Sequence, residues 1–169
     1  TCILFADGAG AAIVTDSDVG IISSVTHSDG SKGMSLKCKD RSTRNFLVKK
    51  AEDPHYIQMI GGDILKFAVR KVPACIELLL EQANCTKDEL KYIVLHQANM
   101  RIISSVAHKL EMSEEKFPTN ITNCGNTSSA SIPLLLDELN RDGRLEKGDK
   151  IVLCGFGGGL TWGAQLIVW

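Results

Sequence analysis

Apolar and polar positions along the first half of the chain predict short strands followed by one long helix. Residues 2–30 are rich in Ile, Val and Ala with interspersed glycines, which predicts two or three short strands with glycine turns. Residues 31–56 are polar with lysine-rich patches, so we expect a surface loop region. Apolar residues recur at helical spacing from 63 to 83, and Pro73 within this helix is expected to kink it or split it in two.

The second half alternates buried runs with amphipathic segments. Thr86 and Glu89 have the spacing of a capping box, and Gly143 is placed as the C-cap of a helix. Strands are predicted at 92–96, 150–156 and 160–169, and helices at 99–112 and 127–143. This order implies an α/β fold in which helices pack on a mixed sheet.

The bulk composition narrows the class of protein. A length of 169 residues fits one domain, and 44% hydrophobic residues, 23% charged residues and a mean hydropathy of +0.02 are ordinary for a soluble globular protein. The net charge of −1 gives no basic footprint for nucleic acid, no apolar run approaches the roughly 20 residues of a membrane span, and no signal peptide opens the chain. Because Thr1 has no Met before it, we expect a piece of a longer polypeptide. The reduced cysteines described next indicate that this polypeptide is cytoplasmic.

The six cysteines are interpreted as buried, reduced thiols. None forms a CxxC pair and no histidine lies at zinc spacing from them, so no metal site is predicted. Several lie within apolar stretches, which is typical of structural cysteines in a reducing compartment.

A strand-to-helix corner at VLHQANMRI gathers an unusual number of polar side chains. His96 ends a buried run, and Gln97, Asn99 and Arg101 follow it directly. Open sheets place functional groups at such corners. Taken alone, His96 is better explained as a core histidine that backbone carbonyls satisfy; the two neighbouring amides favour a functional site.

Two further stretches could contribute to chemistry. Asn126 lies in NCGNTSSAS, where it either caps a helix or stands at a helix start whose free N–H groups attract negative charge. GFGGGLTWG, from Gly155 to Gly163, is either a hairpin turn or a set of backbone donors for an oxyanion. It has neither the GKS or GKT of a phosphate-binding loop nor the context of a dinucleotide site.

Together these groups suit enolate or thioester chemistry but lack a nucleophile. A neutral imidazole, an amide and backbone N–H groups can stabilise an oxyanion, but covalent acyl transfer also needs an activated nucleophile. No GxSxG elbow is present, and nothing around Cys124 signals an activated thiolate.

The motifs HQANMRIISSVAHKL, NCGNTSSASIPLLLDEL and GFGGGLTWGAQLIVW, with LFADGAGAAIV and GIISSVTHSDGS before them, resemble the β-ketoacyl-acyl carrier protein synthase III family. The resemblance covers the chain and is weakest from about residue 32 to 56. It implies a thiolase-like fold of two similar halves, each a five-stranded mixed sheet with packed helices. Residues 1–169 match the C-terminal half, and the nucleophilic cysteine belongs to the N-terminal half, which this chain does not contain.

The resemblance also implies roles for individual residues. His96 and Asn126 hold the thioester carbonyl of malonyl-carrier protein and promote its decarboxylation. The remaining positions fall into three groups: the oxyanion and acyl pocket at Phe156, Gly157 and Gly158; the pantetheine and carrier-protein contacts at Gln97, Asn99, Arg101 and Ile102; and the coenzyme A contacts at Gly61, Gly62 and Leu65. At the last group the sequence departs from the family's common Gly-Asn and aromatic residues.

The implied activity is a decarboxylating Claisen condensation of an acyl-CoA-derived group with malonyl-carrier protein, which initiates type II fatty acid synthesis. It requires no cofactor, and its partners are acyl-CoA, malonyl-carrier protein, the N-terminal half and a second copy in a homodimer. The chain alone is expected to be inactive. The alternatives are a sister thiolase-fold enzyme of secondary metabolism and a non-catalytic domain that binds carrier protein.

Overall fold

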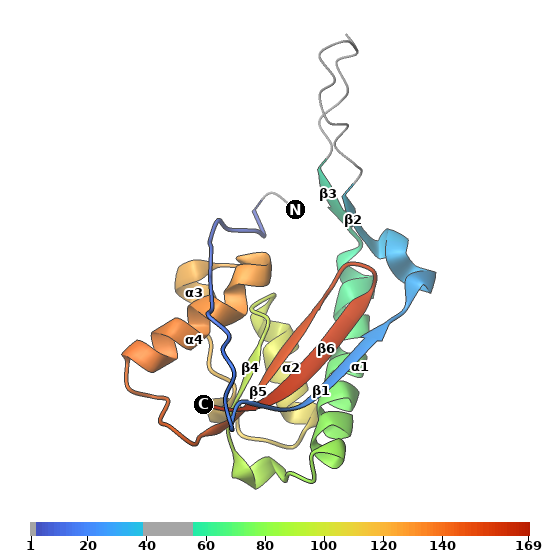
Figure 1. The fold of residues 1–169 in the computed structure, drawn as a ribbon. Helices are drawn as coiled ribbons and strands as arrows, with labels where there is room; N and C mark the ends of the chain where they lie inside the picture. The colour runs from blue at the N-terminus through green and yellow to red at the C-terminus, as the bar shows by residue number, and fades with distance from the viewer. Residues whose placement is uncertain (1–2, 39–55) are drawn as a thin grey trace.

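A computed structural model describes residues 3–38 and 56–169, and its main feature is a mixed sheet with helices on both faces (Figure 1). The strands are β1 (Ile21–Ser28), β2 (Leu36–Cys38), β3 (Ile57–Met59), β4 (Leu90–Leu95), β5 (Lys150–Gly157) and β6 (Thr161–Val168). The helices are α1 (Gly61–Gln82), α2 (Met100–Lys109), α3 (Ile121–Cys124) and α4 (Ser131–Arg141), with short 3₁₀ turns η1 (Gly30–Ser35), η2 (Lys87–Glu89), η3 (Glu114–Lys116) and η4 (Ser128–Ala130).

The main sheet has the order β1-β6-β5-β4. β4 and β5 are parallel, whereas β5–β6 and β6–β1 are antiparallel. β2 and β3 form a separate antiparallel ribbon that extends away from the main sheet (Figure 1). The parallel pair needs a crossover, and the long segment with α2, α3 and α4 supplies it between β4 and β5.

Alternating side chains of the strands divide the core into two layers. Ile93 points into a cluster shared with α1 and α2, while its neighbour Val94 joins a cluster shared with α4. In β5, Val152 and Ile151 divide in the same way. Both faces are therefore buried near β4 and β5, which explains why these strands read as nearly continuous apolar runs.

Of the two outcomes expected at Pro73, the split into two helices is wrong, because α1 is one helix with Pro73 inside it, and the kink stays a prediction. A proline removes a backbone donor and crowds the preceding turn, and this local cost predicts a kink. Buried side chains on both sides of Pro73, including Val72 and Ile76 with no exposed surface, hold the two segments against the same face of the sheet. Tertiary packing thus outweighs the local preference.

The α/β class with a mixed sheet is confirmed, but the described main sheet has four strands instead of the five expected. Residues 3–19 contain no named strand; an isolated bridge joins Phe5 to Asn126. Ile13 and Val14 in this segment are 94% and 84% exposed. A β-rich composition forms a strand only where a neighbouring backbone offers hydrogen bonds, and here the described residues supply one bridge.

Part of the expected surface loop at 31–56 is ordered structure. η1, β2 and the start of β3 fall within or next to it, and residues 39–55 lie outside the described part of the chain. The polar composition concealed the ribbon because β2 and β3 are only three residues long each.

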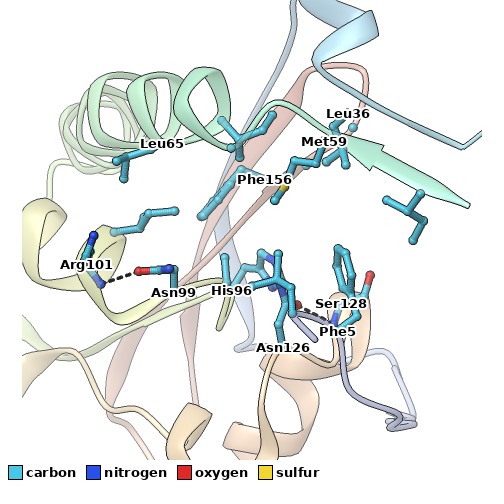
Figure 2. A pocket seen from close by; sticks show the side chains of 18 of the residues that line it. Phe5, Leu36, Met59, Leu65, His96, Asn99, Arg101, Asn126, Ser128 and Phe156 are labelled. Atoms are coloured by element: carbon cyan, nitrogen blue, oxygen red, sulfur yellow. Dashed lines mark hydrogen bonds between the residues drawn. The ribbon is translucent and has the colours of Figure 1, made fainter. Parts of the chain in front are cut away.

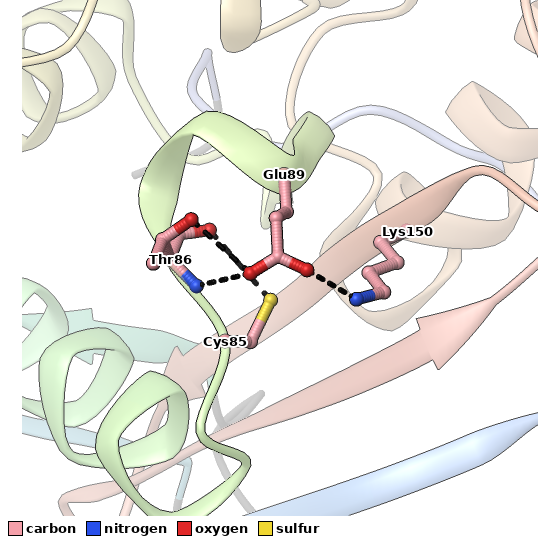
Figure 3. Close-up of polar contacts among 4 residues, drawn as sticks. All are labelled: Cys85, Thr86, Glu89 and Lys150. Carbon is pink, nitrogen blue, oxygen red and sulfur yellow. Dashed lines mark hydrogen bonds and ion pairs between the residues drawn. The ribbon is translucent and has the colours of Figure 1, made fainter.

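The predicted capping box at Thr86 is present and anchors the start of β4 to the start of β5 (Figure 3). The Thr86 N–H and hydroxyl donate to Glu89 Oε1 at 2.8 and 3.1 Å, and the other carboxylate oxygen pairs with Lys150. Lys150, followed by the Thr86 donors, lowers the pKa of Glu89 to about 2. Because Lys150 begins β5, this contact helps to fix the register that places His96 at the opposite end of β4.

The cysteines only partly match the expectation of burial. Cys75, Cys85 and Cys154 are buried, and burial raises the pKa of each thiol. Cys124 is half-buried, and Cys38 is exposed because it ends β2 in the projecting ribbon. Cys75, Cys85, Cys124 and Cys154 are free thiols, and Cys2 lies outside the described residues.

Candidate active site

The corner after β4 is built by its own polar residues. The His96 N–H continues the ladder by donating to Cys154 O at 2.9 Å, and the Ala98 N–H donates to His96 O at 2.9 Å, which turns the chain. Asn99 is the N-cap of α2, since its Oδ1 accepts the Arg101 N–H at 2.8 Å (Figure 2). Part of the polar crowding therefore serves the transition from strand to helix.

Gln97 lies behind the corner, in the interior, which corrects its expected place among the pantetheine and carrier-protein contacts. It has no exposed surface; its Nε2 donates to Leu95 O at 2.8 Å, and its Oε1 accepts the Asn120 N–H at 3.3 Å. Asn120 in turn donates to Glu138 Oε2 at 2.9 Å. A buried amide needs such partners, and these tie the corner to the loop before α3 and to α4.

Asn126 is held in a turn that leaves its amide nitrogen available. It follows Gly125, whose φ of +67° favours glycine, and it is 5% exposed. Its Oδ1 accepts the Ser128 N–H at 2.9 Å (Figure 2), and its main-chain oxygen accepts the Ala6 N–H at 2.9 Å. Since the side-chain oxygen is engaged, the group left to offer a ligand is the Nδ2 donor.

His96 has a neutral imidazole ring, which lines the cavity described in the next paragraph. Desolvation by burial lowers its pKa to about 4, so the ring is uncharged at pH 7. The ring meets Phe156 edge-on, with centroids 5.3 Å apart, and its Nδ1 lies 2.7 Å from Ser131 Oγ. Nε2 is consequently the ring nitrogen left for a ligand.

One cavity of about 410 Å³ collects most of the residues predicted for the site (Figure 2). Of the predicted set, its lining includes His96, Asn126, Phe156, Gly157, Gly158, Asn99, Arg101, Ile102, Gly61 and Leu65. Gly62 is exposed in the first turn of α1 and does not belong to this lining, so its expected placement is not supported. The walls are mostly apolar with few polar groups, as is usual for a small-molecule site.

Several lining residues had no signal in the sequence. Phe5, Leu36, Met59 and Ser128 all border the cavity (Figure 2). Leu36 and Met59 come from the β2–β3 ribbon, where no motif was recognised, and Phe5 lies in the LFADGAGAAIV stretch, to which no site role was given. Ser128 and Ser131 stood in a serine-rich stretch, but their separate contacts with Asn126 and His96 follow only from the three-dimensional arrangement.

The glycine run closes the cavity at the turn between β5 and β6. Gly157 and Gly158 line the cavity, and the Thr161 hydroxyl donates to Gly158 O at 2.9 Å. Gly159 has a φ of +131°, which a residue with a side chain rarely adopts. The run is therefore a hairpin turn that also lines the cavity, and its role as a set of oxyanion donors stays a prediction.

The lining contains no residue arranged as a nucleophile with a base, in the part of the chain that the structure describes. Cys124 does not border the cavity, and Cys38 lies among its outer residues on β2. The same described residues hold no group of three or more His, Cys, Asp or Glu side chains suited to a metal ion. They also contain no helix with the length and hydropathy needed to cross a bilayer.

Comparison with known proteins assigns the arrangement to a class of acyl-transferring synthases. Residues 80–169 match the family model of the 3-oxoacyl-[acyl-carrier-protein (ACP)] synthase III C terminal. A β-ketoacyl-[acyl-carrier-protein] synthase III from Clostridium novyi is 51% identical to this chain. The match covers 100% of this chain and 53% of that protein. The synthase III of Thermus thermophilus superimposes on it with a TM-score of 0.84 at 33% identity, over 100% of this chain and 53% of that one.

A priming β-ketosynthase from the R1128 polyketide pathway is also similar, with a TM-score of 0.79 at 34% identity over 90% of this chain and 46% of that one. The fold is thus that of the thiolase-like synthase III structures, of which this chain matches the C-terminal part. The chain belongs to the 3-oxoacyl-[acyl-carrier-protein] synthase III C-terminal family. It spans about half the length of the relatives that it matches.

Proposed function

We propose that this chain is the C-terminal half of a β-ketoacyl-acyl carrier protein synthase III. The observation that carries the proposal is the pairing of His96 and Asn126 in one largely apolar cavity. The imidazole is neutral and the amide oxygen is occupied by the Ser128 N–H, so both side chains can face a ligand with N–H groups. Two such donors suit a thioester oxygen on which negative charge develops.

The proposed reaction has three steps: acyl transfer to a cysteine, decarboxylation and condensation. A cysteine thiolate of the N-terminal half attacks acyl-CoA; the bond between the acyl carbon and the CoA sulfur breaks, an acyl–cysteine thioester forms, and CoA leaves as a thiolate that takes up a proton from solvent. Malonyl-carrier protein then loses CO₂: the bond between its α-carbon and the carboxylate breaks, and the electron pair passes into an enolate. The enolate carbon attacks the acyl–cysteine carbonyl; a carbon–carbon bond forms, and the cysteine thiolate leaves.

His96 and Asn126 act in the second step. Their N–H groups stabilise the enolate oxygen more strongly than the neutral carbonyl, because the charge is larger in the transition state. In this proposal the backbone N–H groups of Gly157 and Gly158, which also line the cavity, bind the acyl carbonyl in the third step. A dry, apolar lining strengthens each of these interactions.

The partners follow from the same proposal. The substrates are acyl-CoA and malonyl-carrier protein, and the working form is a cytoplasmic homodimer of the longer protein. Arg101 is exposed at the cavity mouth, on the first turn of α2, with His108 and Lys109 exposed two turns further along. Carrier proteins are acidic, so this side of α2 is the proposed docking surface.

A second candidate function is priming in polyketide synthesis, which the similarity to the R1128 β-ketosynthase favours. Both functions use the same decarboxylation and differ in the starter and the carrier protein. Comparing turnover with carrier proteins of the two pathways, at a fixed acyl-CoA, distinguishes them.

The test uses His96→Ala and Asn126→Ala in the full-length enzyme. Each variant is expected to lose about a hundredfold to a thousandfold in malonyl decarboxylation, which is typical for the loss of one preorganised donor. Transfer of a labelled acyl group from CoA to the cysteine should stay largely intact. A variant that decarboxylates at the wild-type rate refutes the assignment.

A further inference from the structure

Ser131 is a buried hydroxyl at the start of α4 that contacts the His96 ring. It is 2% exposed, and its Oγ lies 2.7 Å from His96 Nδ1. The same Oγ accepts the main-chain N–H of Gln97 at 3.2 Å. The hydroxyl therefore touches both the imidazole and the backbone of the next residue, and no sequence motif assigned it a role.

The proton count at this hydroxyl decides which nitrogen of His96 carries hydrogen. A serine hydroxyl has one proton to donate, and the Gln97 N–H already uses it as an acceptor. If Nδ1 carried a proton, Oγ would accept twice, and its own buried proton would need another acceptor. With Nδ1 unprotonated, the hydroxyl donates to Nδ1, and every group in the Gln97–Ser131–His96 chain is satisfied.

We infer that Ser131 is a positioning residue that holds His96 in the tautomer with the proton on Nε2, the nitrogen left for a ligand. The inference rests on the proposed function for its consequence, since an Nε2–H donor is what a developing enolate oxygen needs. The opposite tautomer would turn a lone pair toward that oxygen and repel it.

The turn before α4 also determines which side-chain atom of Asn126 faces the cavity. The Ser128 N–H holds Asn126 Oδ1 at 2.9 Å, which turns Nδ2 toward the cavity, as the Ser131 hydroxyl holds Nδ1 of His96. The stretch from Asn126 to Ser131 thus determines the direction of both N–H donors, although His96 belongs to a different corner of the fold. Of the hydroxyl groups in this segment, the contacts use only that of Ser131, since Ser128 contributes its main-chain N–H.

The test measures the tautomer and the rate separately, in the full-length enzyme. Long-range ¹H–¹⁵N correlation spectra at pH 7 should show His96 protonated at Nε2 in the wild type. Ser131→Ala should populate the Nδ1–H form and slow malonyl decarboxylation about tenfold to a hundredfold, the range seen when a partner that orients a functional histidine is removed. Acyl transfer from CoA should change less than twofold.

Two further variants separate positioning from a general packing defect. Ser131→Thr keeps the hydroxyl and should retain the Nε2–H tautomer and most of the rate. Ser129→Ala makes the same change at an exposed neighbour and should alter neither. A wild-type His96 with its proton on Nδ1 overturns the inference without any variant, and so does Ser131→Ala with an unchanged tautomer and rate.

The outcomes also distinguish this inference from the proposed function. If Ser131→Ala shifts the tautomer while His96→Ala decarboxylates normally, Ser131 positions His96 but the enolate role is wrong. If the tautomer stays fixed while His96→Ala abolishes decarboxylation, the proposed function stands and the role of Ser131 is wrong.

Discussion

Replacing Asn126 with Asp separates its chemical role from its structural one. Asp has nearly the same volume and keeps an oxygen that can accept the Ser128 N–H, which now lies 2.9 Å from Oδ1. The change replaces the side-chain N–H donor with a second oxygen and adds a negative charge. The turn between α3 and α4 should survive because its acceptor remains, and the melting temperature should fall only by the cost of placing that charge at a buried position.

The rate should fall steeply for two reasons. Loss of one preorganised donor costs about 2.7–4 kcal/mol, or a hundredfold to a thousandfold. An ionised carboxylate about 4 Å from the enolate oxygen adds repulsion of about 4 kcal/mol at an effective dielectric constant of 20. We therefore expect Asn126→Asp to decarboxylate malonyl-carrier protein at least a hundredfold more slowly in the full-length enzyme.

Asn126→Ala is the matched comparison, because it loses the acceptor as well as the donor. Removing a side chain that satisfies a turn N–H costs about 1 kcal/mol of stability, so this variant should lose both rate and melting temperature. The assay follows release of labelled CO₂ from malonyl-carrier protein, and acyl transfer from CoA is the internal control. Normal CO₂ release by Asn126→Asp would refute the reasoning, and so would an equal loss in the two half-reactions.

Three other perturbations test different parts of the molecule. The His96 pKa is about 4 in the fold and 6.5 ordinarily, so the unfolded chain binds more protons than the folded chain between these two pH values. The free energy of unfolding should therefore fall as the pH drops from 6.5, by about 3 kcal/mol at pH 4. Denaturant titrations of wild type and His96→Gln check this, and equal acid sensitivity would contradict it. Arg101→Glu should raise the KM for malonyl-carrier protein, less so at high salt, with little change for acyl-CoA; an equal effect on both substrates would place Arg101 in a shared channel. The isolated chain should make no acetoacetyl-carrier protein, and turnover that disappears in Cys124→Ser or Cys38→Ser would show that it contains its own nucleophile.

Several local features of the fold were predictable, because their causes lie close by in the sequence. The end of β4, the cap of α2, the Thr86 capping box and Gly143 after α4 all follow from residues within a few positions of one another. Gly143 has a φ of +67°, as expected of a glycine that terminates a helix. The resemblance to a family then linked His96 with Asn126, which periodicity alone does not do.

The remaining features depend on contacts between distant segments. Pro73 is tolerated because the sheet holds both ends of α1, and Gln97 turns inward because Leu95 and Asn120 provide partners there. The segment at 3–19, which forms one isolated bridge, resembles β1 in composition, and only the neighbouring backbone distinguishes the two. Such outcomes depend on packing partners that no short window of sequence contains.

The strand order has a consequence for biosynthesis. β6 is flanked by β1 on one side and β5 on the other, yet of the described elements it is the last to leave the ribosome. β1 must therefore wait unpaired for more than a hundred residues of translation, while β4 and β5 can already form their parallel pair. A ribosome that stalls before residue 161 would release a chain with two open strand edges, and such edges recruit foreign strands. Completion of β6 is thus the step at which β1 and the β4–β5 pair of the nascent chain are joined into one continuous sheet.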